Sequence, residues 1–203
     1  MTTADRPAST LSPIALFAAG MGLVFLFPAC SSMGVRKSVE GVLRRHLGKS
    51  APLPATNRSP ASNVASTLDQ ARQIGFQRPL REIQITSPFG RRDGRPHEGI
   101  DFQAPEGTPF YAAADGIVVF AGSSINGYGN TVILLHAGRY STLYAHASAL
   151  IVQPGETILK GQALGYVGET GNATAPHLHF ELRHELAPLN PAHYVPVIRN
   201  RYN

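Results

Sequence analysis

From about residue 80 onward the sequence is a series of short β-prone runs separated by turn residues. Runs such as "GIVVFAG" (116–122), "TVILLHA" (131–137) and "HLHFEL" (177–182) alternate with stretches rich in Gly, Pro and Asn. Eight such runs follow one another with no long helical pattern between them, and parallel strands would need such crossover segments. The spacing therefore predicts an antiparallel all-β domain.

The stretch "APHLHFEL" (175–182) places two histidines on alternate positions of one of these runs. Alternate side chains of a strand share a face, so His177 and His179 point the same way while Leu178 and Phe180 point into the core. An imidazole is costly to bury without a partner. The pattern predicts that both histidines project from a core strand into a shared polar space.

A second candidate group lies upstream in "PHEGIDF" (96–102). If this segment is a strand, His97 and Asp101 share a face, and Gly99 between them leaves space for a close approach. The chain has a single cysteine, so a cysteine cluster is excluded. Three ligands from His and Asp with one open position indicate a catalytic zinc site, with one of the paired histidines completing the set.

A third element is "TLYAHAS" (142–148), in which strand alternation puts Tyr144 and His146 on one face. His146 and the remaining paired histidine are then available to handle protons near the metal. A water bound there, with its pKa lowered to about 7, would be a nucleophile at neutral pH.

The motifs "PHEGIDFQAPEGTP", "GYGN", "STLYAH" and "PHLHFEL" resemble the landmarks of the lysostaphin-type, or LytM-like, zinc endopeptidases of bacterial cell walls. The resemblance covers roughly residues 80–195. It implies a β-sandwich of the LytM-like, duplicated hybrid motif type, with one zinc ion at the floor of a groove. By this resemblance the zinc ligands are His97, Asp101 and His179, and the catalytic residues are His146 and His177.

Two features depart from the family pattern. Ala175 stands where the family usually has Gly, and no equivalent of the upstream asparagine ligand of the lysostaphin-like branch is evident. The short loop "GRRDGRPH" (90–97) suggests an open groove, whose arginines could meet substrate carboxylates. The candidates for substrate binding are Arg91, Arg92, Arg95 and Tyr144.

The resemblance implies a zinc metalloendopeptidase that hydrolyses peptide cross-links of peptidoglycan, and a lipoprotein-like signal favours a D,D-endopeptidase. Some members of the family have lost ligands and act as non-enzymatic activators of cell-wall amidases. Every ligand position is filled here, which favours catalysis. The activator, with an amidase or adaptor as its partner, remains the alternative.

The N-terminus reads as an export segment. Residues 14–27 form an apolar run that suits a signal peptide and is short for a membrane span of about 20 residues. Ala29 and Cys30 resemble the lipobox of bacterial lipoproteins, although the two residues before Ala29 depart from it. We expect a signal peptide over 1–29 and a lipidated Cys30 that anchors a periplasm-facing protein of the cell envelope; an uncleaved anchor and ordinary cleavage are the alternatives.

Residues 30–78 are expected to form a basic, Pro- and Ser-rich tether, followed by the metallopeptidase domain over 79–198. The tether carries the basicity of the chain, because from residue 81 onward nine Lys and Arg face ten Asp and Glu. A nucleic-acid partner would need a basic folded surface, so none is indicated.

The tether contains two helical patterns. In the first, the apolar residues recur at helical spacing with arginines between them, which predicts either a helix lying on the membrane surface or a marginal helix in a disordered tail. The second runs over 66–76. The apolar residues of the first pattern are Val35, Val39, Val42, Leu43 and Leu47.

Overall fold

The computed structural model describes residues 38–48, 68–82, 84–92 and 94–195. The predicted signal peptide, Cys30, residues 49–67 of the predicted tether and the last residues of the predicted domain lie outside the described residues. In the described part of the chain, no helix is both long and apolar enough to cross a membrane.

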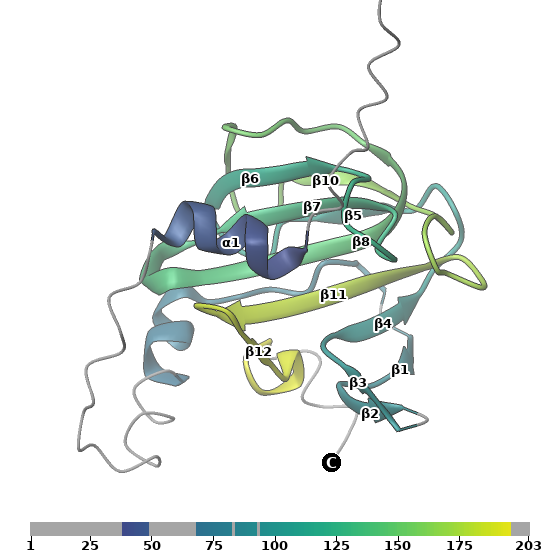
Figure 1. Ribbon diagram of the computed structural model, residues 1–203, viewed down its shortest axis with the longest axis horizontal. Helices are drawn as coiled ribbons and strands as arrows, with labels where there is room; N and C mark the ends of the chain where they lie inside the picture. Colours follow the sequence, from purple (N-terminus) through teal and green to yellow (C-terminus); the bar gives the residue numbers. More distant parts are fainter. Residues whose placement is uncertain (1–37, 49–67, 83, 93, 196–203) are drawn as a thin grey trace, which may run out of the picture. The chain divides into compact units, whose positions relative to one another are not determined.

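Twelve strands in the described residues form the domain, and every recorded strand pairing is antiparallel (Figure 1). The predicted antiparallel all-β class is therefore confirmed. The strands are β1 (Ile85–Ser87), β2 (Gly90–Arg92), β3 (Arg95–His97), β4 (Ile100–Gln103), β5 (Pro109–Tyr111), β6 (Gly116–Gly122), β7 (Asn130–Leu135), β8 (Tyr140–Leu150), β9 (Thr157–Ile158), β10 (Ala163–Val167), β11 (His177–His184) and β12 (Ala187–Leu189).

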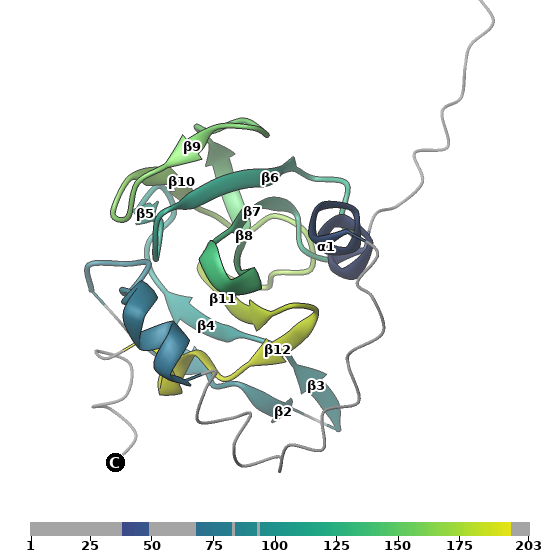
Figure 2. The same cartoon turned by 90° about the vertical axis from the view of Figure 1, so that its left-hand side faces the viewer.

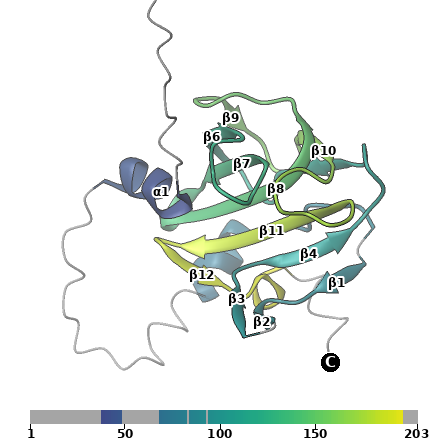
Figure 3. The ribbon, with the colours of Figure 1, turned by 45° about the vertical axis from the view of Figure 1, so that its right-hand side comes forward.

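The main sheet has the order β1-β4-β11-β8-β7-β6-β9. β12 pairs with β11, and β10 pairs with both β8 and β5, while β2 and β3 form a separate hairpin. β11 consequently lies between β4 and β8, as Figure 3 shows. Two short 3₁₀ helices, η1 (Ala137–Arg139) and η2 (Pro191–His193), also lie in the described residues.

The main hydrophobic core lies on one face of the central strands. Phe102 of β4, Leu178 and Phe180 of β11, and Tyr144 of β8 are all fully buried in it. Side chains at the alternate positions of the same strands point to the other face of the sheet. That other face carries a second, smaller apolar cluster and the polar residues described below.

Helix α1 (Val39–Leu47) forms where the sequence predicts an amphipathic helix, and Ser38 caps its N-terminus through a 3.0 Å hydrogen bond from Gly41 N. Its apolar side chains pack with residues of β6, β7 and β8 in the second cluster. Figure 2 shows the helix beside the edge of these strands. Both expectations for this helix, a membrane-bound face and a disordered tail, are corrected, because the sheet itself covers the apolar face. The buried helix residues are Val39, Val42 and Leu43.

The core also extends N-terminal of the expected domain start at residue 79. Residues 68–74 are helical, in agreement with the second helical pattern. Ala71, Phe76 and Leu80 are at most 2% exposed and belong to the main core. A fragment that begins at residue 80 would therefore lack side chains that fill the interior.

Candidate metal centre

Three side chains from separate elements meet on the polar face of the sheet. His179 of β11 is the antiparallel partner of Asp101 of β4, and His97 ends β3. Asp101 Oδ1 lies 2.7 Å from His179 Nδ1 and 3.1 Å from His97 Nε2, and the two nitrogens are 3.2 Å apart. All three residues are at most 8% exposed. The arrangement thus concentrates three potential ligand atoms in one small volume.

The alternation of β11 explains how a buried strand can carry polar residues. Leu178 and Phe180 enter the core, whereas His177 and His179 occupy the opposite face, as the sequence predicts. The upstream segment behaves differently from the prediction. His97 and Asp101 are not on one continuous strand, because the chain leaves β3 after His97 and bends before β4 begins at Ile100.

Backbone and side-chain acceptors fix the tautomers of the two ligand histidines. His97 Nδ1 is 2.7 Å from the carbonyl oxygen of Pro88, which can only accept, so this nitrogen carries the proton and Nε2 presents its lone pair. His179 Nε2 is 3.1 Å from Glu181 Oε1, so its Nδ1 faces Asp101 as an acceptor. Both lone pairs consequently point toward the same carboxylate.

Three acceptor atoms this close repel one another unless a cation or a proton lies between them. When protons rather than a cation lie between them, His179 and His97 donate to Asp101; burial opposes the charge of Asp101, but these hydrogen bonds outweigh it and hold its pKa well below its usual range. Burial likewise opposes protonation of His179, yet its bonds to Asp101 and Glu181 raise its pKa to about 9. The site therefore favours positive charge between its ligands.

A zinc ion fits this donor set. Tetrahedral zinc with bonds of about 2.0–2.1 Å holds its ligand atoms roughly 3.3 Å apart, and the three separations here run from 2.7 to 3.2 Å. Two neutral imidazoles and one carboxylate are a common ligand set for catalytic zinc, and three protein ligands leave a position open.

A second pair of histidines borders this group. The rings of His146 and His177 are 4.7 Å apart, and His177 Nε2 is 3.8 Å from Asp101 Oδ1. His146 Nδ1 donates to Thr170 O at 2.7 Å, and His177 Nδ1 donates to Ala175 O at 2.8 Å. Each ring therefore keeps Nε2 as an acceptor. Burial lowers the pKa of His146 to about 4, so its imidazole is neutral at pH 7.

The backbone of His146 is in the left-handed region, with φ of 61°. It lies in a bulge of β8, since Tyr144 and Ala147 pair with Val132 and Asn130, leaving two β8 residues opposite one of β7. A non-glycine residue held in this conformation stores strain, which is typical of functional sites.

The comparisons with known proteins agree with this geometry. The sequence matches peptidase family M23 over residues 95–191. The catalytic domain of the prophage-encoded M23 protein EnpA from Enterococcus faecalis superposes with a TM-score of 0.53 at 34% identity, covering 57% of this chain and 95% of that one. The chain belongs to peptidase family M23. The resemblance drawn from the sequence motifs is thereby confirmed.

Two curated relatives of this M23 protein have contrasting names. The DD-carboxypeptidase/endopeptidase Mpg of Neisseria meningitidis is 46% identical over 119 residues, which are 56% of this chain and 27% of that protein. The murein hydrolase activator NlpD of Salmonella typhimurium is 33% identical over 146 residues, which are 72% of this chain and 38% of that protein. The M23 chain thus spans less than half the length of either relative.

Glu181 is a part of the M23 site that the sequence analysis did not single out. It is fully buried on the same strand face as His179, where Oε1 also accepts a 2.7 Å hydrogen bond from the Tyr128 hydroxyl. Arg183 Nε donates to Glu181 Oε2 at 2.6 Å, and its Nη2 pairs with Glu98. Strand alternation places residues 181 and 183 on the same face as His179, so the sequence pattern could have identified both as neighbours of the site.

Tyr144 was predicted to share a face with His146 and to contact the substrate, but the structure places it in the main core. The bulge adds one residue to β8, so Tyr144 and His146 point to opposite faces of the sheet. Tyr144 is fully buried in the main core. Its hydroxyl accepts hydrogen bonds from Ala113 N at 2.8 Å and Thr142 Oγ1 at 2.9 Å. His136 Nε2 lies 2.7 Å from the same Thr142 hydroxyl.

The predicted arginines lie on the β2–β3 hairpin, which ends at the ligand His97. Arg91 and Arg95 are exposed, and Arg91 Nη2 donates to Gly94 O at 2.9 Å. Arg92 is the last residue of β2. Substrate binding by these three residues stays a prediction.

Gly99 has no Cβ and therefore lets β11 lie close to the backbone before β4. Its replacement should disturb the metal site. A Cβ at this position would lie 2.5 Å from Phe180 O and 2.8 Å from His179 Cε1. We expect Gly99→Ala to lower the free energy of unfolding by about 1–3 kcal/mol and to weaken zinc binding at least about tenfold because His179 shifts. Thermal unfolding and zinc titration would measure both effects.

Gly165→Ala is the matched control for this change, because its Cβ would lie 2.4 Å from the carbonyl oxygen of Ala149, away from the metal ligands. It should cost comparable stability and leave the zinc affinity unchanged. If Gly99→Ala binds zinc as tightly as the original chain, the close contact with His179 does not position this ligand.

Proposed function

We propose that this M23 protein is a zinc-dependent endopeptidase that hydrolyses peptide cross-links of peptidoglycan. One observation carries the proposal: two histidines lie beside a complete group of three metal ligands. The Nδ1 atoms of these histidines are hydrogen-bonded to backbone carbonyls, which leaves their Nε2 atoms free to accept a proton. A purely structural zinc site would have four protein ligands and would not need the two additional histidines.

The reaction follows from the tautomers. His97 Nε2, Asp101 Oδ1 and His179 Nδ1 would hold the zinc ion. Bound zinc polarises a peptide carbonyl and lowers the pKa of a water to about 7. His146 and His177 orient the attacking water, and an Nε2 accepts its proton. The same proton is then donated to the leaving nitrogen, so that a peptide and water give a carboxylic acid and an amine.

The substrate class rests on relatives with catalytic names. Mpg, 46% identical over the aligned region, is named a DD-carboxypeptidase/endopeptidase. By this analogy we assign to the chain a D,D-endopeptidase activity on D-alanyl–diaminopimelate cross-links. A cross-link of this kind consists of two peptide stems, and its cleavage converts a muropeptide dimer into monomers.

The cellular location rests on the sequence alone. The apolar run 14–27 and the lipobox-like Ala29–Cys30 support export and lipidation, with the catalytic domain facing the periplasm. Peptidoglycan would be the partner there, and the membrane would be contacted through the lipid anchor.

The test is mass spectrometry of purified cross-linked muropeptide dimers incubated with the full chain. With zinc present we expect conversion to monomers, and with a chelator we expect the dimers to stay intact. Dimers that survive incubation with the zinc-loaded chain would contradict the hydrolase.

The second candidate function is that of a non-enzymatic activator of a cell-wall amidase. It is supported by the relative named murein hydrolase activator NlpD, whose alignment covers 72% of this chain. The filled ligand positions favour the hydrolase. An activator would leave muropeptide dimers intact and would instead raise the rate at which a purified amidase releases stem peptides.

A further inference from the structure

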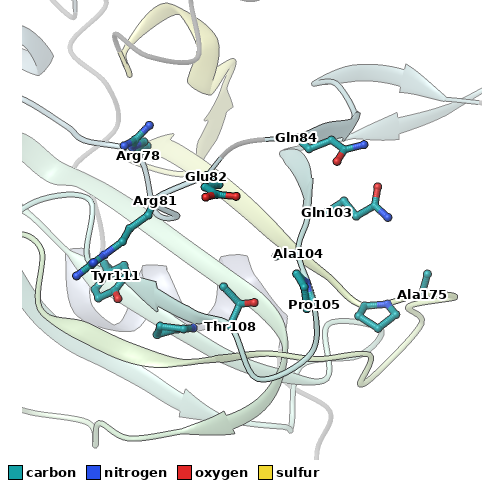
Figure 4. A pocket seen from close by; sticks show the side chains of 12 residues that line it. Arg78, Arg81, Glu82, Gln84, Gln103, Ala104, Pro105, Thr108, Tyr111 and Ala175 are labelled. Atoms are coloured by element: carbon teal, nitrogen blue, oxygen red, sulfur yellow. The ribbon is translucent and has the colours of Figure 1, made fainter.

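A large cleft adjoins the candidate metal centre at the end of β4. Its volume is about 1130 Å³. Two of its lining residues are direct neighbours of His177. Gln103 is the antiparallel partner of this histidine, and Pro176 precedes it in the chain. In Figure 4, Gln103 and Ala175 lie on one side of the cleft, with Arg81 and Tyr111 on the other.

The opposite wall includes Arg78, Arg81 and Glu82, which lie in a segment that precedes the region matched by the M23 family. Backbone hydrogen bonds of 2.8 Å hold this segment at both ends, from Gln77 N to Ala113 O and from Gln103 N to Gln84 O. Leu80, between them, is 2% exposed and belongs to the main core. The wall is therefore a fixed part of the folded domain.

Two guanidinium groups on this wall are not neutralised by an ion pair with any described residue. Arg78 and Arg81 are exposed, and Arg81 is held 5.5 Å above the ring of Tyr111. Glu82 is the single acidic residue among the residues lining the cleft. The cleft therefore has a net positive charge, and the side-chain amides of Gln84 and Gln103 add neutral hydrogen-bonding groups.

We propose that this cleft binds a free carboxylate of the peptidoglycan stem peptide, with Arg78 and Arg81 as its partners. Guanidinium groups bind carboxylates through paired, charge-assisted hydrogen bonds, and stacking on an aromatic ring preorients one of them. Diaminopimelate has a free carboxylate on the carbon that bears the cross-linking nitrogen. This inference rests on the proposed function, since it names the part of that substrate which the cleft recognises.

The test compares two ligands that differ only in charge. Muropeptide dimers with free or amidated diaminopimelate carboxylates are titrated calorimetrically into the zinc-loaded full chain carrying His146→Ala, which slows turnover during the measurement. We expect the free-carboxylate dimer to bind about tenfold more tightly than the amidated dimer. The double change Arg78→Gln and Arg81→Gln should remove this difference.

Arg72→Gln is the matched control, because Arg72 is exposed, pairs with Asp69 at 3.2 Å and does not line the cleft. It should retain the full preference for the free carboxylate. Equal affinity for the two dimers, or a preference that survives the double change, would overturn the carboxylate site.

Cleavage by the chain with His146 intact separates this inference from the proposed function. If that chain leaves both dimers intact while the arginine-dependent preference is present, the hydrolase fails and the carboxylate site stands. If it cleaves both dimers and shows no arginine-dependent preference, the hydrolase stands and the carboxylate site fails.

Discussion

His179→Ala is expected to abolish zinc binding, whereas His146→Ala is expected to retain zinc and lose about 10²–10⁴-fold in turnover. The first change removes one of three ligand atoms that lie within 3.2 Å of one another. The second change leaves those atoms in place and removes an imidazole that orients the attacking water and can accept its proton. Zinc content by mass spectrometry and the initial rate of dimer cleavage would measure the two effects separately.

His193→Ala is the control for this pair, because His193 is exposed on η2 and is not among the metal-site residues. It should change neither zinc content nor cleavage rate. The assignment of roles would be wrong if His179→Ala kept stoichiometric zinc, or if His146→Ala lost zinc together with activity.

Glu181→Gln is expected to weaken zinc binding about 10–100-fold, the range typical for loss of a carboxylate that orients a ligand histidine. Glu181 accepts from His179 Nε2, from Tyr128 and from Arg183, so each of its oxygens already faces a donor. An amide at this position must direct its own NH₂ group at one of these donors. His179 then loses the partner that fixes its tautomer, or Arg183 loses its buried acceptor.

Glu98→Gln distinguishes ligand positioning from loss of stability. Glu98 pairs with the far side of the Arg183 guanidinium, and no hydrogen bond joins it to His179 among the described residues. This variant should lose stability while keeping its zinc affinity within a few-fold. A dissociation constant for zinc that is the same in Glu181→Gln and the original chain would show that Glu181 does not orient the ligand.

The sequence predicted the parts of the site that depend on strand alternation. His177 and His179 were assigned to one face because a strand has a period of two, and the structure has them there. Tyr144 was assigned incorrectly because a bulge adds a residue and inverts the alternation after it. Nothing in the local sequence marks such a bulge, since it depends on the pairing with β7.

Helix α1 shows a second limit of prediction from sequence periodicity. Its period identified the apolar face correctly, but the period does not specify which surface covers that face. The packing of Val42 and Leu43 against the sheet depends on apolar residues of β6, β7 and β8, which lie far away along the chain. The buried Phe76 was assigned to a tether for the same reason, because its partners are distant in sequence.

Anomalous X-ray scattering at the zinc edge, from crystals of the zinc-loaded full chain, would test the central claim most directly. The account predicts one strong peak within bonding distance of His97 Nε2, Asp101 Oδ1 and His179 Nδ1. A peak elsewhere, or no peak among these three atoms in protein that retains zinc in solution, would contradict it.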